Sequence, residues 1–300
     1  MAGWSIDDLR LPVIMAPMFL VSGPELVVAG CRAGVLGTFP ALNQRTSDGY
    51  DAWLGQIADG LGDQPAPFGV NLVVHRDNAR LKADLAVTLR HQVPLVITSL
   101  GVDPELIAAV QSYGGRVFHD VTTARHAEKA IGAGVDGLIA VCAGAGGHAG
   151  TLSPFALVPE IRRIFAGTIV LGGAISTGRQ VAAARLIGAD AAYVGTRFIA
   201  TRESLANDAY KQMLVDAGSA DIVYTQAVSG MPANFLKPSL LAAGLDPQGK
   251  RGEIDIGAGD AKAWRDVWSA GQGVGSIADI PSTADLVDRL AQDYVAARLT

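Results

Sequence analysis

One strand-and-turn unit is the most informative part of this chain, and it reads Gly137-Leu138-Ile139-Ala140-Val141-Cys142-Ala143-Gly144-Ala145-Gly146-Gly147-His148-Ala149-Gly150. Its apolar start is short enough for a buried strand. The turn that follows is almost entirely Gly and Ala, so its backbone is free to adopt positive φ and to approach a flat or anionic ligand closely. Its one histidine, His148, has a side chain suited to proton transfer near neutral pH. We interpret the turn as a small-molecule site, with a tight loop and a structural histidine as the alternative.

Similar units recur along the chain, each a short apolar run followed by a segment with helical spacing or a helix cap. The candidate strands are Val13–Ala16, Val35–Thr38, Phe68–Asn71, Leu95–Thr98, Arg116–His119, Gly137–Val141, Ile169–Leu171 and Ala191–Val194. Such alternation is typical of a parallel sheet with a helix after each strand. Helix starts are predicted at Asp103-Pro104, at Thr122 or Thr123, and at Ser176 or Thr177.

The number of these units favours a closed barrel over an open sheet. About eight units fit into about 200 residues, as in a TIM barrel. The first strand is followed by Ala16-Pro17-Met18, whereas an open dinucleotide-binding sheet normally carries GxGxxG there. The sequence therefore predicts an α/β fold, a (β/α)8 TIM barrel, with its chemistry at the C-terminal ends of the strands.

The regular rhythm breaks after Arg202. A helix-like segment, Leu205–Val215, is followed by an apolar stretch marked by Pro and Gly and then by the polar segment Asp246–Gly259. We expect residues 1–203 and 262–300 to form the barrel and residues 204–261 to form a smaller inserted lid or substrate domain.

Composition excludes several classes of function. The chain has 300 residues, 49% hydrophobic and 18% charged, with a formal net charge of −5. It lacks the basic footprint that nucleic acid or an anionic membrane surface requires. Asp7 and Asp8 precede a short apolar run, unlike a signal peptide, and no apolar stretch reaches the length of about 18 residues that suggests a membrane span, so we expect a cytoplasmic protein. Cys31 and Cys142 have no histidine at metal-ligand spacing, and we expect no metal.

Two glycine turns follow the last two predicted strands. They are Gly172-Gly173-Ala174, ahead of Ser176-Thr177, and Gly195-Thr196. In TIM barrels the loops after strands seven and eight often hold a phosphate through backbone N–H groups, with no need for Lys or Arg. We predict a phosphate site here, with ordinary tight turns as the alternative.

Several segments together closely resemble the nitronate monooxygenase family, formerly called 2-nitropropane dioxygenases. They are Met15-Ala16-Pro17-Met18, Phe68-Gly69-Val70-Asn71, Ala145-Gly146-Gly147-His148-Ala149-Gly150, Gly172-Gly173-Ala174-Ile175, Val194-Gly195-Thr196-Arg197-Phe198 and Trp268-Ser269-Ala270-Gly271-Gln272-Gly273. The FMN-dependent enoyl-acyl-carrier-protein reductases share much of this pattern. The likeness spans nearly the whole chain.

The resemblance implies a flavoprotein whose barrel binds FMN. His148 would be the base that takes the α-proton of a neutral nitroalkane or that orients the nitronate. The resemblance places the flavin ring against the backbone of Ala16, Pro17 and Met18 and the side chain of Asn71, the phosphate on Gly172, Gly173, Ala174, Gly195 and Thr196, and the closest approach of the flavin at Ala145, Gly146 and Gly147.

The chain departs from the family after the fifth strand, where these enzymes often carry Lys or Gln and this chain has His119-Asp120. We expect His119 to contact FMN, with a buried strand-end histidine satisfied by the backbone as the alternative. Met231 resembles a family position near the substrate cavity, although a packing role is equally compatible.

The resemblance implies a monooxygenase, an oxidoreductase that uses O₂ to convert an alkyl nitronate or nitroalkane to a carbonyl compound and nitrite. An NAD(P)H-dependent FMN enoyl reductase and a flavin-binding protein without turnover are the alternatives. The expected partners are a small-molecule substrate and O₂. A homodimer is compatible with the sequence, which leaves the oligomeric state open.

Overall fold

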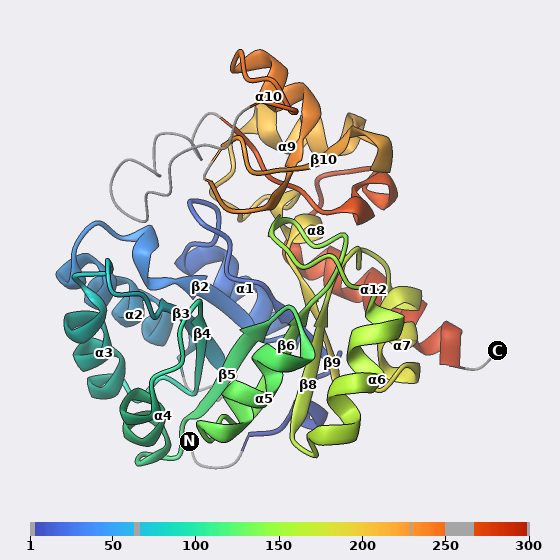
Figure 1. Ribbon diagram of the computed structural model, residues 1–300. Coiled ribbons are helices and arrows are strands. Elements are labelled where there is room, and N and C mark those ends of the chain that lie inside the picture. Colours follow the sequence, from blue (N-terminus) through green and yellow to red (C-terminus); the bar gives the residue numbers. More distant parts are fainter. Residues whose placement is uncertain (1–3, 63–66, 229, 250–266, 299–300) are drawn as a thin grey trace.

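The computed structural model describes residues 4–62, 67–228, 230–249 and 267–298 (Figure 1). Within these residues eight parallel strands form one sheet, in the order β1-β9-β8-β6-β5-β4-β3-β2. They are β1 (Val13–Met15), β2 (Gly37–Pro40), β3 (Phe68–Val73), β4 (Leu95–Ser99), β5 (Arg116–Val121), β6 (Gly137–Val141), β8 (Thr168–Gly172) and β9 (Ala191–Val194). The sheet closes where Ile14 bridges Leu36 and Met15 N donates to Leu36 O over 2.9 Å. The predicted TIM barrel is confirmed.

Helices cover the outside of the barrel (Figure 1). After β9 and the intervening residues, the last helix takes the eighth place, where it packs against the helices that follow β8 and β1. The outer helices are α1 (Pro24–Ala33), α2 (Ser47–Leu61), α3 (Leu81–Arg90), α4 (Pro104–Gln111), α5 (Ala124–Gly132), α6 (Pro154–Ile164), α7 (Gly178–Leu186) and α12 (Thr283–Arg298). The predicted helix starts are confirmed, because Asp103, Thr123 and Thr177 accept backbone N–H groups of α4, α5 and α7.

The strand bounds follow the predictions closely, with one clear shift. Both β6 and β9 have the predicted bounds, whereas β2 begins two residues after the predicted Val35. Val35 belongs instead to the turn that ends α1, where Gly34 adopts a φ of +97° and Val35 N donates to Gly30 O. This turn uses a left-handed residue to satisfy the last carbonyls of the helix.

Alternating residues of the strands face two different cores. One set points into the barrel, where Trp4 and Ile6 also pack; it includes Ile14, Leu36, Leu95, Ile97, Phe118, Ile139, Val170 and Ala191. The other set packs against the outer helices and includes Val13, Val96, Val117, Val121, Leu138, Ile169 and Val194. Because both faces of the strands are buried, hydropathy alone does not distinguish them.

A second, three-stranded sheet lies above the barrel (Figure 1). Its order is β10 (Ile222–Thr225), β11 (Ala233–Leu236) and β7 (Gly147–His148), with antiparallel pairing throughout. Helices α8 (Thr196–Ile199), α9 (Asp208–Asp216) and α10 (Lys237–Ala242) accompany it. Residue 229 and residues 250–261 of the expected lid lie outside the described residues, and the division into two domains stays a prediction.

The remaining short elements are the 3-10 helices η1 (Ile6–Asp8), η2 (Ala41–Asn43), η3 (Ser219–Asp221) and η4 (Gln272–Ser276). In the part of the chain that the structure describes, no helix has the length and apolar character needed to cross a membrane.

Candidate active site

The C-terminal ends of the barrel strands, here called the mouth, bring most of the predicted site residues together. The turns after β8 and β9 lie side by side because these two strands are paired. In this part of the chain, the backbone N–H groups of Gly173, Gly195 and Thr196 donate to no described group. Unused backbone amides on neighbouring turns are a common anion site. The residues present therefore fit a bound phosphate.

The start of α7 contributes less to this site than its sequence suggests. The N–H groups of Ser176 and Thr177 both donate to Oε1 of Gln180, over 2.7 and 3.0 Å. These amides are already satisfied by a capping box. The hydroxyl of Ser176, in contrast, is buried without a partner among the described residues.

The glycine turn after β6 packs directly against the turns after β8 and β9. Gly144 O accepts hydrogen bonds from Ala174 N over 3.2 Å and from Gln272 N over 2.9 Å. Gly144 itself has a φ of +85°, a conformation that favours glycine. A Cβ at Gly146 would lie 2.8 Å from Gly271 N, so this position has no room for a side chain. The turns after β6 and β8 and the segment before η4 therefore form one unit.

His148 lies above the mouth, in the second sheet. It belongs to β7 and pairs with Ala233 of β11. The buried side chain of Asn234 donates to Ala145 O over 2.7 Å, and Tyr224 OH donates to Ala149 O over 3.0 Å. The β10–β11 hairpin thus holds the turn that carries His148. The residue is exposed to solvent, while the surrounding protein atoms desolvate its ring and lower its pKa.

The turn after β1 lies beside the turn after β9, whereas the turn after β6 lies beside the turn after β8. Ala16 N donates to Val194 O over 2.9 Å, which places Ala16 next to β9. Asn43 fixes the rest of this turn, because its Nδ2 donates to the carbonyls of Met18 and Ser22 and its Oδ1 accepts from Leu20 N. The predicted Ala16-Pro17-Met18 backbone is therefore held at the mouth.

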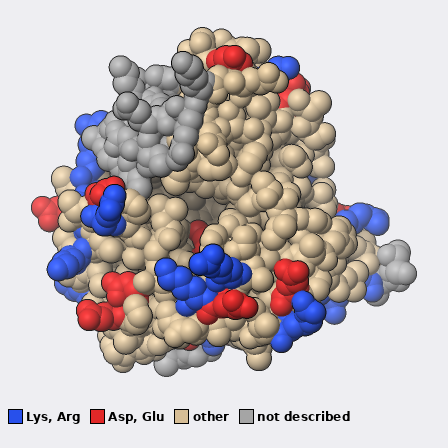
Figure 2. Space-filling model, in the orientation of Figure 1, with Lys and Arg blue, Asp and Glu red and all other residues tan. Residues whose placement is uncertain are grey.

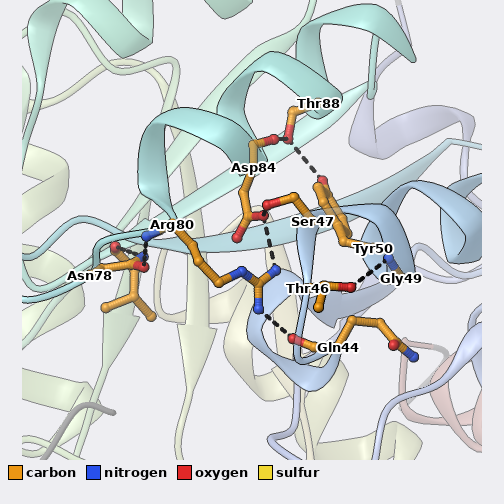
Figure 3. A network of polar contacts seen from close by, with 10 residues as sticks. Gln44, Thr46, Ser47, Gly49, Tyr50, Asn78, Arg80, Asp84 and Thr88 are labelled. Atoms are coloured by element: carbon orange, nitrogen blue, oxygen red, sulfur yellow. Dashed lines mark hydrogen bonds and ion pairs between the residues drawn. The ribbon is translucent and has the colours of Figure 1, made fainter. Parts of the chain in front are cut away.

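A polar network on the outside braces the loops after β2 and β3 (Figure 3). Arg80 binds Gln44 O in the first of these loops and forms an ion pair of 2.9 Å with Asp84 of α3. Ser47 of α2 donates to the same carboxylate over 2.6 Å, and Asn78 donates to Val73 O at the end of β3. The Asp84 side chain is 1% exposed, so this pair is a buried anchor for the loops around the mouth.

Three polar side chains form a chain inside the mouth across β3, β4 and β5. Asn71 Nδ2 donates to Ser99 Oγ over 2.7 Å, and Ser99 Oγ donates to Asp120 Oδ2 over 2.6 Å. The second carboxylate oxygen, Asp120 Oδ1, is buried with no partner among the described residues. Burial raises the pKa of Asp120 to about 6, although the bond from Ser99 opposes this rise.

The structure does not bring His119 into the mouth. Val117 and Val121, two residues to either side, pack on the outer face of β5, and strand alternation places His119 with them. Its Nδ1 lies 2.8 Å from Thr98 Oγ1, the residue is 4% exposed, and burial lowers its pKa to about 4. Asp120, the next residue, faces the mouth instead. Cys142 is likewise fully buried beside the outer helices, and burial raises the pKa of its thiol to about 12.

The sequence placed Ser99 and Asp120 at the ends of predicted strands without indicating a role for either, and it gave no indication of Asn43 or Asn234. Asp120 was visible next to His119, but the alternation did not reveal which of the two points inward. Asn234 stands out as an amide within the apolar run Ala233–Leu236, which is a signal of a buried structural bond. Figure 2 shows the surface hollowed between the barrel and the part above it, with acidic atoms at the bottom of the hollow.

The closed (β/α)8 barrel defines the class of TIM-barrel proteins, and the unused amides after β8 and β9 fit a phosphate-bearing ligand at the mouth. Comparison with known proteins is more specific. The chain belongs to the nitronate monooxygenase family, whose model matches residues 78–293. This family, like the FabK proteins among its structural neighbours, consists of flavoenzymes that are generally FMN-dependent.

Individual relatives differ in their names. A (3aS,4S,5R,7aS)-5-hydroxy-7a-methyl-1-oxo-octahydro-1H-indene-4-carboxyl-CoA dehydrogenase of Mycobacterium tuberculosis is 32% identical over 77% of this chain, which spans 64% of that protein's length. The nitronate monooxygenase of Pseudomonas aeruginosa is 30% identical over 76% of this chain and 77% of its own. The structure of a nitroalkane oxidase from Streptomyces ansochromogenes covers 98% of both chains with a TM-score of 0.85 and 29% identity. FabK of Thermotoga maritima gives a TM-score of 0.83 at 25% identity, over 98% of this chain and 96% of its own.

Proposed function

We propose that this protein is an FMN-dependent enzyme that oxidises alkyl nitronates or nitroalkanes with O₂ to a carbonyl compound and nitrite. The observation that carries the proposal is the position of His148, on a turn packed against the unused amides after β8 and β9. The similarity to a nitronate monooxygenase and to a nitroalkane oxidase supports the same reaction. The expected cytoplasmic location belongs to this proposal.

The residues that would hold FMN follow from the mouth. Gly173, Gly195 and Thr196 would bind the phosphate through their N–H groups, with Gly172 and Ala174 completing the turns. Ala16-Pro17-Met18 and Asn71 would border the flavin ring, and the absence of side chains at Gly146 and Gly147 would let it approach the turn after β6. When bound, FMN would supply an electron acceptor for the oxidation of the substrate.

His148 would remove the α-proton of a neutral nitroalkane. A general base must be unprotonated at the working pH, and the lowered pKa of His148 keeps the imidazole neutral at pH 7. The exposure of His148 would give substrate access to it, while the hairpin that holds β7 fixes its position. A preformed nitronate has already lost this proton, so His148 would only orient it.

A second candidate is an NAD(P)H-dependent FMN reductase of an enoyl thioester. It is favoured by the likeness to FabK and to a dehydrogenase named for a carboxyl-CoA substrate. Steady-state assays of the purified protein separate the candidates: propyl nitronate with O₂ tests the first, and NADPH with an enoyl thioester tests the second. Turnover of the thioester alone would reject nitronate oxidation, and FMN binding without either activity would indicate a flavin-binding protein.

The role of His148 has its own test. We expect His148→Asn to keep FMN and to lose activity on a neutral nitroalkane by roughly 10²–10⁴, the usual contribution of a positioned general base. Activity on the preformed nitronate should fall far less. Equal losses on both substrates would mean that His148 orients the anion and removes no proton.

A further inference from the structure

One carboxylate in the mouth has no structural explanation. From the residues that the structure describes, Asp120 receives a single hydrogen bond, from Ser99 to its Oδ2 over 2.6 Å, and its Oδ1 is buried without a partner. A buried acceptor that lacks a donor is destabilising by about 1–3 kcal/mol. Most buried polar side-chain atoms in proteins have a hydrogen-bond partner. Asp84 Oδ2 also has none among the described residues, but the carboxylate of Asp84 forms an ion pair with Arg80, whereas no described cation pairs with Asp120. Asp120 is therefore arranged for a donor that a ligand brings.

The neighbours of Asp120 place its side chain on the inner side of the barrel, at the mouth. Phe118, two residues earlier on β5, packs inside the barrel, so Asp120 points to the same side. Ser99 and Asn71 extend the polar chain along the rim of β4 and β3. Tyr193 of β9 faces the same interior, and its pKa is raised well above the ordinary value by burial and by Asp120. The phenol therefore stays neutral, and in the described residues no cation pairs with this carboxylate.

The ring of FMN carries the hydrogen-bond donor that Asp120 Oδ1 lacks. Its isoalloxazine carries an N–H donor beside carbonyl acceptors, and the ring gains electron density when it is reduced. Charge beside the ring is one of the main ways in which a protein tunes a flavin. An ionised carboxylate accepts the N–H group but opposes added negative charge, whereas a protonated one donates a hydrogen bond and carries no charge.

We propose that Asp120 contacts the flavin ring through Oδ1 and, by gaining or losing its proton, sets how strongly the protein prefers oxidised over reduced FMN. This inference rests on the proposed FMN binding and makes Asp120, with Ser99 as its positioning residue, the group that tunes the cofactor. The pKa of about 6 places the change of charge within the physiological range. Asp120 is mostly protonated at pH 5 and ionised at pH 8, so reduced FMN is bound less favourably at the higher pH.

The experiment measures the reduction potential of the FMN-loaded protein between about pH 5 and pH 8, relative to free FMN in the same buffers. The ratio of the dissociation constants of reduced and oxidised FMN should rise by about tenfold or more across this range, which corresponds to about 30 mV for a two-electron couple. Asp120→Asn should bind FMN and lose the pH-dependent change. Asp77→Asn is the matched control, because Asp77 lies after β3 at the same end of the barrel with its side chain 60% exposed, and it should behave as the wild type.

Ser99→Ala provides an independent second variant. Loss of the hydroxyl removes a bond that stabilises the carboxylate, so the inflection should move to higher pH. An unmoved inflection in this variant, or identical profiles for Asp120→Asn and the wild type, would overturn the role of Asp120 while leaving FMN binding intact. A wild-type protein that takes up no FMN would overturn both this inference and the proposed function.

Discussion

Replacing Gly195 by Asp tests most directly whether the turns after β8 and β9 bind the phosphate of FMN. Gly195 has a φ of −105°, which any residue can adopt, and a Cβ there would lie 3.5 Å from Ala16 Cβ and 3.6 Å from Met18 Sδ. These are ordinary contacts, so the barrel should still fold. The new carboxylate would stand where the amides of Gly195 and Thr196 face an anion. One added negative charge about 4 Å from a phosphate is unfavourable by about 4 kcal/mol at an effective dielectric constant of about 20.

This energy corresponds to a loss of roughly 10³-fold in FMN affinity. Quenching of flavin fluorescence on titration with the apoprotein measures the dissociation constant, and circular dichroism checks the fold. Gly195→Ala separates the added Cβ from the added charge and should lose far less. Gly55→Asp makes the same substitution on α2, where no atom lies within 4 Å, and should leave binding unchanged. Wild-type affinity in Gly195→Asp would show that the phosphate binds elsewhere.

Three further predictions follow from the described contacts. The value of kcat/KM for a neutral nitroalkane should rise with pH through a pKa below 6.5 and then level off, because His148 accepts a proton only when neutral; an inflection well above 7 in the pH profile would contradict this. Asn234→Ala leaves the carbonyl of Ala145 without its donor, so the free energy of unfolding should fall by about 1–3 kcal/mol in denaturant titrations, with a larger loss of activity on nitroalkane than on nitronate. Arg80→Ala leaves Asp84 buried and unpaired and should lower the free energy of unfolding by about 3–5 kcal/mol, whereas Arg76→Ala, at a side chain that is 89% exposed, should change it by less than about 0.5 kcal/mol.

The barrel could be predicted from the sequence because each of its units is local. The run Ala191–Val194, for example, lies between the end of a helix and a glycine, each within a few residues. The strand in the structure has the same bounds. The two-residue strand β7 has no such signal. Its partner, Ala233-Asn234, lies far along the chain, and pairing over that separation leaves no periodic pattern to read.

The site was harder to predict than the fold for a second physical reason. In β5, Phe118 and Asp120 face the inside of the barrel while Val117 and His119 face the helices, and all of this strand is buried or nearly so. Hydropathy therefore indicated a buried strand but not which of the alternating side chains point into the barrel. The contact of His119 with FMN stays a prediction, but the geometry now favours Asp120 for that position.

The pairing of β7 with β11 has a consequence for how this protein could be re-engineered. Gly147 and His148 belong to the loop after β6, yet their hydrogen-bonding partners arrive only after β9, in the segment that would vary if substrate preference were altered. Exchanging that segment for one from a relative would also exchange the scaffold beneath the candidate base. A working chimera must therefore transplant both loops together, and substrate range and proton transfer cannot be optimised independently.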